Sequence, residues 1–225
     1  MFSSLTAVLF DFDGTLIDAS AVICTCFNAA LTKYDLEPVP FETIKLGIGR
    51  PLRELFAEQG DQVSVDLLTD EYKRVFAELS AGRSYPLPGA EDLVSSLSRG
   101  HRLGIVTSRS SSGTSKILKD LGLLDCFSTI VGIEDVINGK PDPEPVFLAL
   151  ERLSVRPHHS VFIGDTTYDM QAGSRAGTRT IGVTSGSHTR EELLEAGAEV
   201  VVGNLYSLRS LLNGSEESDS EITLV

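Results

Sequence analysis

The segment from Val8 to Leu16, with the sequence VLFDFDGTL, constrains the fold most strongly, because an apolar run stops abruptly at two carboxylates and a glycine. This pattern is typical of a buried strand that carries charged groups to its own C-terminal end, where open α/β sheets bind their ligands. The period-two alternation of a strand directs Asp11 and Asp13 to the same side. Two adjacent carboxylates repel each other, so the pair favours a bound cation, a shared proton or contact with solvent. On this segment alone, an acidic turn after a strand is the alternative interpretation.

Short apolar runs alternate with helical patterns from residue 102 onward, which indicates repeated βα units and a mainly parallel sheet. Together with the first run, this alternation predicts six strands, at residues 7–11, 103–107, 128–132, 161–165, 180–183 and 200–202. The segments between them have apolar residues at helical spacing. The predicted fold class is therefore α/β, with helices flanking a parallel sheet.

Residues 17–84 break this alternation, because they show helical patterns at 21–34, 41–46, 51–59 and 63–79 and no strand pattern. We expect an all-helical insertion between two core segments, 1–16 and 85–212. The insertion begins beside the carboxylates, so it is placed to close over them and exclude water. A second small domain with no role at the site is the alternative. Residues 213–225 are acidic and small, and we expect this tail to be disordered.

Two further predicted strand ends carry groups suited to an anion. Thr107 and Ser108 offer hydroxyl and backbone N–H groups just before a helix, which suits either an anion site or a helix cap. Lys140 lies in a loop that the neighbouring prolines stiffen. A fixed ammonium suits a transferring phosphoryl group and a nearby carboxylate, although most lysines in loops are solvated.

A third strand end repeats the opening pattern, since an apolar run stops at Gly164 and Asp165, and Asp169 follows at helical spacing. Oxygen ligands from Asp11, Asp13 and Asp165 would form a magnesium site. Asp169 would bind the ion through water or orient Asp165. Read alone, Asp165 could equally be a helix cap.

The composition limits the partners of the chain. Its 32 acidic and 19 basic residues give a formal net charge of −13, which disfavours nucleic acid and anionic membranes as partners. No run approaches the roughly 20 apolar residues that span a bilayer, so we expect a soluble protein. Three cysteines, Cys24, Cys26 and Cys126, lack metal-site spacing and suggest a reducing, cytoplasmic location.

Taken in order, four segments resemble the motifs of the haloacid dehalogenase superfamily of phosphotransferases. They are DFDGT at 11–15, Thr107, Lys140 within GKP, and Gly164–Asp165 with Asp169. The resemblance covers residues 8 to about 202 and implies a Rossmann-like core, with residues 17–84 as a helical C1-type cap.

The resemblance also implies a mechanism in which Asp11 attacks phosphorus and forms an aspartyl-phosphate, while Asp13 protonates the leaving oxygen and later deprotonates water. A carboxylate can act as such a nucleophile, and its neighbour as such an acid and base. The implied phosphate-binding residues are Gly14, Thr107, Ser108 and Lys140. The implied cofactor is Mg²⁺, held by Asp11, Asp13, Asp165 and Asp169, the last of them directly or through water.

Position 13 narrows the implied reaction, because dehalogenases of this superfamily have tyrosine and phosphonatases have alanine where this chain has Asp13. The chain therefore looks like a phosphoester enzyme. The segment GIGR at 47–50 is similar to the loop by which β-phosphoglucomutases hold a second phosphate, so Arg50 is a candidate for binding an anionic group of the substrate. The helix after the first motif lacks the histidine of those mutases, which favours hydrolysis.

We therefore expect a magnesium-dependent hydrolase of a small phosphorylated metabolite, phosphoglycolate-like or a sugar phosphate, acting as a monomer or a homodimer. Two alternatives stay open. One is a β-phosphoglucomutase-like phosphomutase. The other, from a different class, is a phospho-acceptor signalling module, which would place an aspartate, a hydroxyl and a lysine around magnesium on a parallel sheet.

Overall fold

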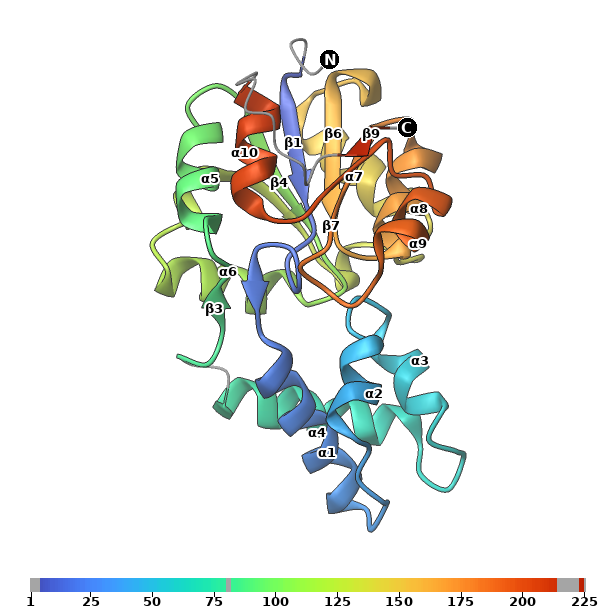
Figure 1. The fold of residues 1–225 in the computed structure, drawn as a ribbon. Helices are drawn as coiled ribbons and strands as arrows, with labels where there is room; N and C mark the ends of the chain where they lie inside the picture. Colours follow the sequence, from blue (N-terminus) through green and yellow to red (C-terminus); the bar gives the residue numbers. More distant parts are fainter. Residues whose placement is uncertain (1–4, 80–81, 214–222, 225) are drawn as a thin grey trace.

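The computed structural model describes residues 5–79, 82–213 and 223–224, and its centre is a sheet with the strand order β5-β4-β1-β6-β7-β8-β9 (Figure 1). The first six of these strands pair in parallel. Their bounds are β1 Ala7–Phe10, β4 Arg102–Val106, β5 Phe127–Val131, β6 Ser160–Gly164, β7 Arg179–Val183 and β8 Val200–Val202. The predicted parallel α/β sheet is confirmed, and each strand lies within one residue of its predicted range.

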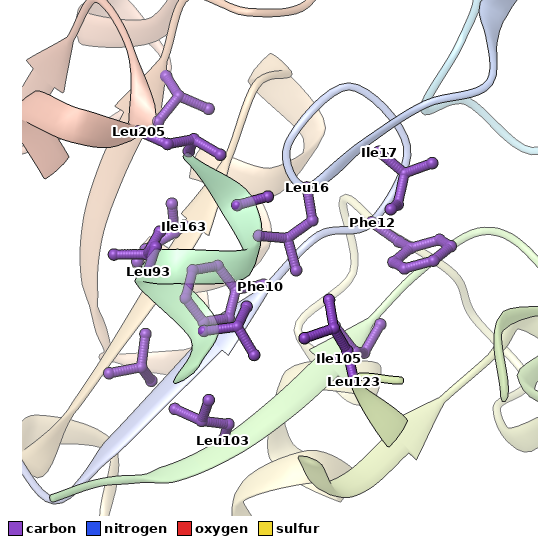
Figure 2. Close-up of a cluster of buried hydrophobic side chains, with 14 of the residues drawn as sticks. Phe10, Phe12, Leu16, Ile17, Leu93, Leu103, Ile105, Leu123, Ile163 and Leu205 are labelled. Carbon is purple, nitrogen blue, oxygen red and sulfur yellow. The ribbon is translucent and has the colours of Figure 1, made fainter. Parts of the chain in front are cut away.

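Helices cover both faces of the sheet, as the alternation of β1 requires. Val8 and Phe10 face α5 (Ala90–Leu97), α6 (Ser111–Asp120) and α10 (Leu205–Asn213), whereas Ala7 and Leu9 face α7 (Glu144–Leu153) and α8 (Thr167–Ala176). Figure 2 shows Phe10 among side chains from α5, β4 and α10. Helix α9 (Arg190–Glu195) packs against α8, β7 and β8. Short 3₁₀ turns, Leu124–Cys126, Ile133–Asp135 and Pro157–His159, complete the connections.

Four helices from the insertion lie together beyond the end of the sheet toward which β1 runs (Figure 1). They are α1 (Ser20–Lys33), α2 (Phe41–Leu46), α3 (Leu52–Ala57) and α4 (Val65–Leu79), close to the four predicted ranges. They share an apolar core in which the rings of Phe27 and Phe56 stack with their centroids 4.3 Å apart. We refer to α1–α4 as the cap. The exact division into core, cap and tail stays a prediction.

The two chain segments that join the cap to the sheet pair with each other. Strands β2 (Ile17–Asp18) and β3 (Tyr85–Pro86) form an antiparallel ribbon, which the sequence did not indicate because two residues are too few to show alternation. The apolar core of the sheet includes Phe12 and Leu16 near this ribbon (Figure 2), and the same cluster extends to Val75 of the cap. The cap is therefore packed onto the sheet through apolar contacts as well as through its covalent connections.

A last strand, β9 (Thr223–Leu224), pairs antiparallel with β8. These two residues belong to the tail for which we expected disorder, and residues 214–222 and 225 of that tail lie outside the described residues. The unpaired edge of β8 offers free N–H and C=O groups, which accounts for the added strand. Within the described ranges, no helix combines the length and the apolar character needed to cross a membrane.

Candidate active site

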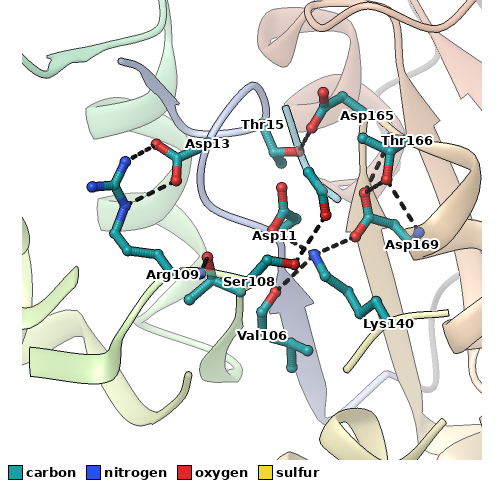
Figure 3. Close-up of polar contacts among 12 residues, drawn as sticks. Asp11, Asp13, Thr15, Val106, Ser108, Arg109, Lys140, Asp165, Thr166 and Asp169 are labelled. Atoms are coloured by element: carbon teal, nitrogen blue, oxygen red, sulfur yellow. Dashed lines mark hydrogen bonds and ion pairs between the residues drawn. The ribbon is translucent and has the colours of Figure 1, made fainter. Parts of the chain in front are cut away.

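Three of the predicted site residues directly follow neighbouring strands. Asp11 follows β1, Thr107 follows β4 and Asp165 follows β6. Because these strands are adjacent and parallel, their C-terminal ends meet at one edge of the sheet. Figure 3 shows Asp11 and Asp165 at this edge together with Lys140 and Asp169. Residues that lie far apart in the sequence thus form one buried cluster beneath the cap.

Lys140 is the centre of this cluster rather than a solvated surface lysine. Its ammonium nitrogen lies 2.7 Å from Asp11 Oδ1 and 2.6 Å from Asp169 Oδ1, and its side chain is only 1% exposed. It also donates a longer bond, of 3.4 Å, to the carbonyl oxygen of Val106. The ammonium therefore fixes one oxygen of Asp11 and leaves the other oxygen free.

The two later aspartates are held by hydroxyl groups. Asp165 Oδ1 accepts a hydrogen bond of 2.7 Å from the hydroxyl of Thr15. Asp169 Oδ2 accepts bonds from the backbone N–H and the hydroxyl of Thr166, and this reciprocal arrangement caps the N-terminus of α8. Both oxygens of Asp169 thus accept hydrogen bonds, one from Lys140 and the other from Thr166, and its expected role at the metal ion stays a prediction.

The cluster has the composition of a divalent-cation site. Carboxylate oxygens of Asp11, Asp165 and Asp169 all lie within 4.8 Å of one another. Asp11 Oδ2 is buried and has no hydrogen-bond partner among the described residues. A buried carboxylate oxygen without a partner is costly, and Mg²⁺ prefers such oxygen ligands. The residues present therefore fit a magnesium ion, with Asp11 and Asp165 as its best placed ligands.

The electrostatics of the cluster point the same way. Burial raises the pKa of Asp11 to about 7; Lys140 opposes this shift, and the neighbouring carboxylates add to it. Burial, with the charges of Asp11 and Asp169, raises the pKa of Asp165 well above its usual value. Burial alone would lower the pKa of Lys140, but the two carboxylates outweigh it and raise that pKa. The charged forms of these carboxylates are thus disfavoured in the protein alone, and a bound divalent cation would stabilise them.

Asp13 lies apart from this cluster. Its carboxylate faces Arg109 in Figure 3, with Oδ2 2.9 Å from Nε and Oδ1 2.5 Å from Nη2. The Arg109 guanidinium lies 4.4 Å from the centre of the Phe76 ring in α4. The structure therefore does not bring the Asp13 carboxylate to the proposed metal site, in contrast to the sequence-based prediction. The reason is that a bidentate arginine pair satisfies it elsewhere.

Two glycines bring backbone close to Asp165. Gly14 has a φ of +90°, which favours glycine, and a Cβ there would collide with the Asp165 carboxylate. A Cβ at Gly186, in the loop after β7, would collide with the same carboxylate. The hydroxyl of Ser185 donates a bond of 2.6 Å to the carbonyl oxygen of Gly14. Backbone from two loops therefore shapes the wall beside Asp165.

Thr107, Ser108 and Arg50, the remaining predicted binding residues, each have a different partner in the structure. Thr107 is buried, and its hydroxyl accepts a bond from the backbone N–H of Arg109. Ser108 Oγ donates a 2.9 Å bond to the carbonyl oxygen of Gly49 in the cap, so this hydroxyl links core and cap. Arg50 Nη2 lies 2.5 Å from a carboxylate oxygen of Glu58 within the cap. The structure thus pairs Arg50 with a neighbouring acid rather than with the buried cluster.

Sequence reasoning missed several residues of the site. The strongest is Arg109, a basic residue two positions after Thr107 at the same strand end, which could have been noticed from that position alone. Thr166 and Asp169 form a Thr-x-x-Asp pattern that is a readable helix-start signal. Thr15 and Gly186 carried no signal of comparable strength, because their roles depend on a residue distant in the sequence.

Comparison with known proteins gives consistent results. The sequence model of the family described as haloacid dehalogenase-like hydrolase matches residues 8–183. The chain is 36% identical over 193 residues to the pyrophosphatase PpaX of Bacillus velezensis, a match that covers 80% of this chain and 83% of that protein. It is 29% identical over 220 residues to a phosphoglycolate phosphatase of Nitrosospira multiformis, covering 94% and 97%. The crystal structure of a haloacid dehalogenase-like hydrolase from Bacteroides fragilis has a TM-score of 0.86 at 31% identity, covering 91% and 99%.

Proposed function

The chain belongs to the haloacid dehalogenase-like hydrolases, and we propose that it is a magnesium-dependent phosphatase that cleaves esters of small phosphorylated metabolites through an aspartyl-phosphate on Asp11. One observation carries this proposal. Lys140 fixes the Asp11 carboxylate through Oδ1, while Oδ2 has no hydrogen-bond partner among the described residues, so the carboxylate is oriented by the protein without being fully engaged by it.

In the proposed first step, a carboxylate oxygen of Asp11 bonds to phosphorus, and the bond from phosphorus to the leaving oxygen breaks. Asp13 gives its proton to that oxygen. In the second step Asp13 takes a proton from water, whose oxygen attacks phosphorus and releases phosphate and Asp11. Asp13 must turn away from Arg109 to perform this role.

The other residues hold the phosphoryl group and balance its charge. Lys140 and the backbone N–H of Ser108, which follows the buried Thr107, would bind phosphate oxygens. A bound magnesium ion, held by Asp11 and Asp165, would neutralise charge between the nucleophile and the phosphoryl group. The apolar contacts between cap and sheet would keep bulk water away.

Substitution of the nucleophile tests the proposal. We expect Asp11→Asn to lower kcat for p-nitrophenyl phosphate with magnesium by a factor on the order of 10³ or more, because the amide cannot attack phosphorus. The matched control is Asp120→Asn, which removes an exposed carboxylate from the end of α6 and should leave the rate unchanged. Wild-type turnover by a folded Asp11→Asn variant would contradict the proposal.

Trapping of the intermediate gives a second, independent readout. An acyl phosphate is reduced by borohydride, so a quenched reaction should contain homoserine at position 11, detectable by mass spectrometry. With p-nitrophenyl phosphate, whose leaving group departs as a stable anion and needs no proton from Asp13, Asp13→Asn should increase its amount, since the second step then lacks its base. Released phosphate, measured beside isomerised sugar phosphate, separates a phosphatase from a phosphomutase. A phosphorylated Asp11 in the wild type that lasts for minutes would favour the signalling alternative.

A further inference from the structure

A pocket of about 80 Å³ lies between the cap and the buried cluster. Asp13 and Asp165 line it from the core, and Ile23, Lys45 and Ile48 line it from the cap. Its volume is well below the roughly 300–1,000 Å³ of pockets for drug-sized ligands. The pocket therefore suits a short leaving group attached to a phosphoryl group that sits over the cluster.

The acidic residues that line this pocket already have partners. Asp13 is paired with Arg109, Asp165 accepts a bond from Thr15, and Asp18 accepts bonds from the backbone N–H and the hydroxyl of Ser20. Their interactions with the protein do not call for a cationic ligand in the pocket beyond the metal ion. The lining also contains one basic side chain, and this side chain has no such partner among the described residues.

That positive charge belongs to Lys45, the one basic residue among those that line the pocket. Lys45 lies in the last turn of α2 and is half-buried, and within the described ranges its ammonium forms no hydrogen bond or ion pair. Arg50, the cation that the sequence analysis favoured, does not line the pocket, because it pairs with Glu58 and lies 3.7 Å from Glu54. In the described part of the chain, Lys45 thus faces the pocket without an acidic partner, whereas Arg50 is held by acidic residues of the cap.

We infer that Lys45 binds a second negatively charged group on the substrate, so that the enzyme prefers short phosphate esters or anhydrides that also carry a carboxylate or another phosphate. This inference rests on the proposed function and adds the chemical class of the leaving group. Ile23 and Ile48 make part of the pocket lining apolar. The three serine hydroxyls of the lining already have partners within the protein, Ser20 with Asp18, Ser185 with Gly14 and Ser187 with His188, so the lining is poorly suited to a polyhydroxylated ring. The phosphoglycolate and pyrophosphate named for two relatives both carry a second anionic group.

A set of substrates matched in size tests the inference. The wild type is compared with Lys45→Gln on 2-phosphoglycolate, on pyrophosphate and on 2-hydroxyethyl phosphate, in which a neutral hydroxymethyl group replaces the carboxylate. We expect kcat/KM of the variant to fall about tenfold to hundredfold for the two anionic substrates, the size expected for a lost hydrogen bond to a charged group. For the neutral substrate it should change less than twofold. The loss should appear mainly in KM, since Lys45 binds ground state and transition state alike.

The controls separate the inference from a general effect on folding and from the proposed function. Lys73→Gln removes an exposed lysine of α4 in the same cap and should leave all three values unchanged. An equal fall on all three substrates, or no fall on any, would overturn the role of Lys45 while hydrolysis itself stands. A loss on pyrophosphate alone or on phosphoglycolate alone identifies which anion Lys45 recognises. Failure of the wild type to hydrolyse any of them would overturn the proposed function, and this inference with it.

Discussion

Asp13 and Arg109 form a bidentate ion pair that is largely shielded from water, with side chains 13% and 10% exposed. A planar guanidinium matches both oxygens of one carboxylate, which a lysine could not do. The same guanidinium lies over the Phe76 ring of the cap. Arg109 of the core therefore connects Asp13, the proposed general acid and base, to helix α4 of the cap.

Removal of this arginine should affect stability more than removal of an ordinary surface cation. We expect Arg109→Met to lower the free energy of unfolding by about 2–4 kcal/mol, because it leaves the largely shielded Asp13 carboxylate without its arginine partner. In the double variant with Asp13→Asn, the loss should be smaller than the sum of the single losses by at least about 1 kcal/mol. Urea denaturation of the four proteins measures this difference. Additive losses would show that the two side chains do not stabilise each other.

At the scale of single elements, the cap depends on a contact between its two longest helices. Glu71 of α4 is only 6% exposed, and its carboxylate lies 2.8 Å from the ammonium of Lys33 in α1 and 2.7 Å from the guanidinium of Arg74. Hydrogen bonds from Arg74 and Lys33 lower the pKa of Glu71 to about 2. The carboxylate thus stays charged where an unperturbed glutamate would be protonated.

This shift predicts how the stability of the cap depends on pH. A carboxylate with a lowered pKa in the folded state stabilises that state above its unfolded pKa of about 4.5, and this contribution disappears as the pH falls toward about 2. We therefore expect Glu71→Gln to lower Tm at neutral pH and the difference from wild type to shrink progressively below pH 4.5. Glu78→Gln, which removes the exposed partner of Arg74 in the same helix, should have a smaller effect. A difference that does not vary with pH would contradict the ionic origin of the contact.

At the scale of the whole molecule, the sequence predicted what depends on local pattern. The six parallel strands and the four cap helices could be located because the spacing of apolar residues within each segment differs between strands and helices. The meeting of Asp11 and Asp165 at one edge of the sheet followed from a rule about parallel strands, which needs no side-chain detail. Neither local patterns nor this rule predicts which partner a charged or polar side chain contacts when several partners compete for it.

Three side chains of the predicted site illustrate that limit. Asp13 has a carboxylate that either a cation site or an arginine can satisfy, and the choice of Arg109 depends on how the cap packs over both. Ser108 and Arg50 were expected at the phosphate, but the structure gives them the carbonyl of Gly49 and the carboxylate of Glu58. Gly49 lies in the cap, whose position relative to the core no local pattern specifies. Glu58 lies eight residues after Arg50, beyond the (i, i+3) and (i, i+4) spacings at which helical pairs can be read from a sequence.

The excess negative charge of the buried cluster should make the stability of the whole molecule depend on magnesium. Three carboxylates share one ammonium there, and Asp11 Oδ2 lacks a hydrogen-bond partner among the described residues, so an ion that binds only the folded state stabilises it. At 100 times Kd this amounts to about 2.7 kcal/mol, or a rise in Tm of about 5–10 °C for a chain of this size. Thermal unfolding in EDTA, in MgCl₂ and in NaCl of equal ionic strength measures the effect. Asp165→Asn removes one repelling carboxylate, so this variant should be at least as stable as wild type in EDTA and should gain little from magnesium. An equal rise in Tm for both proteins would place the ion elsewhere.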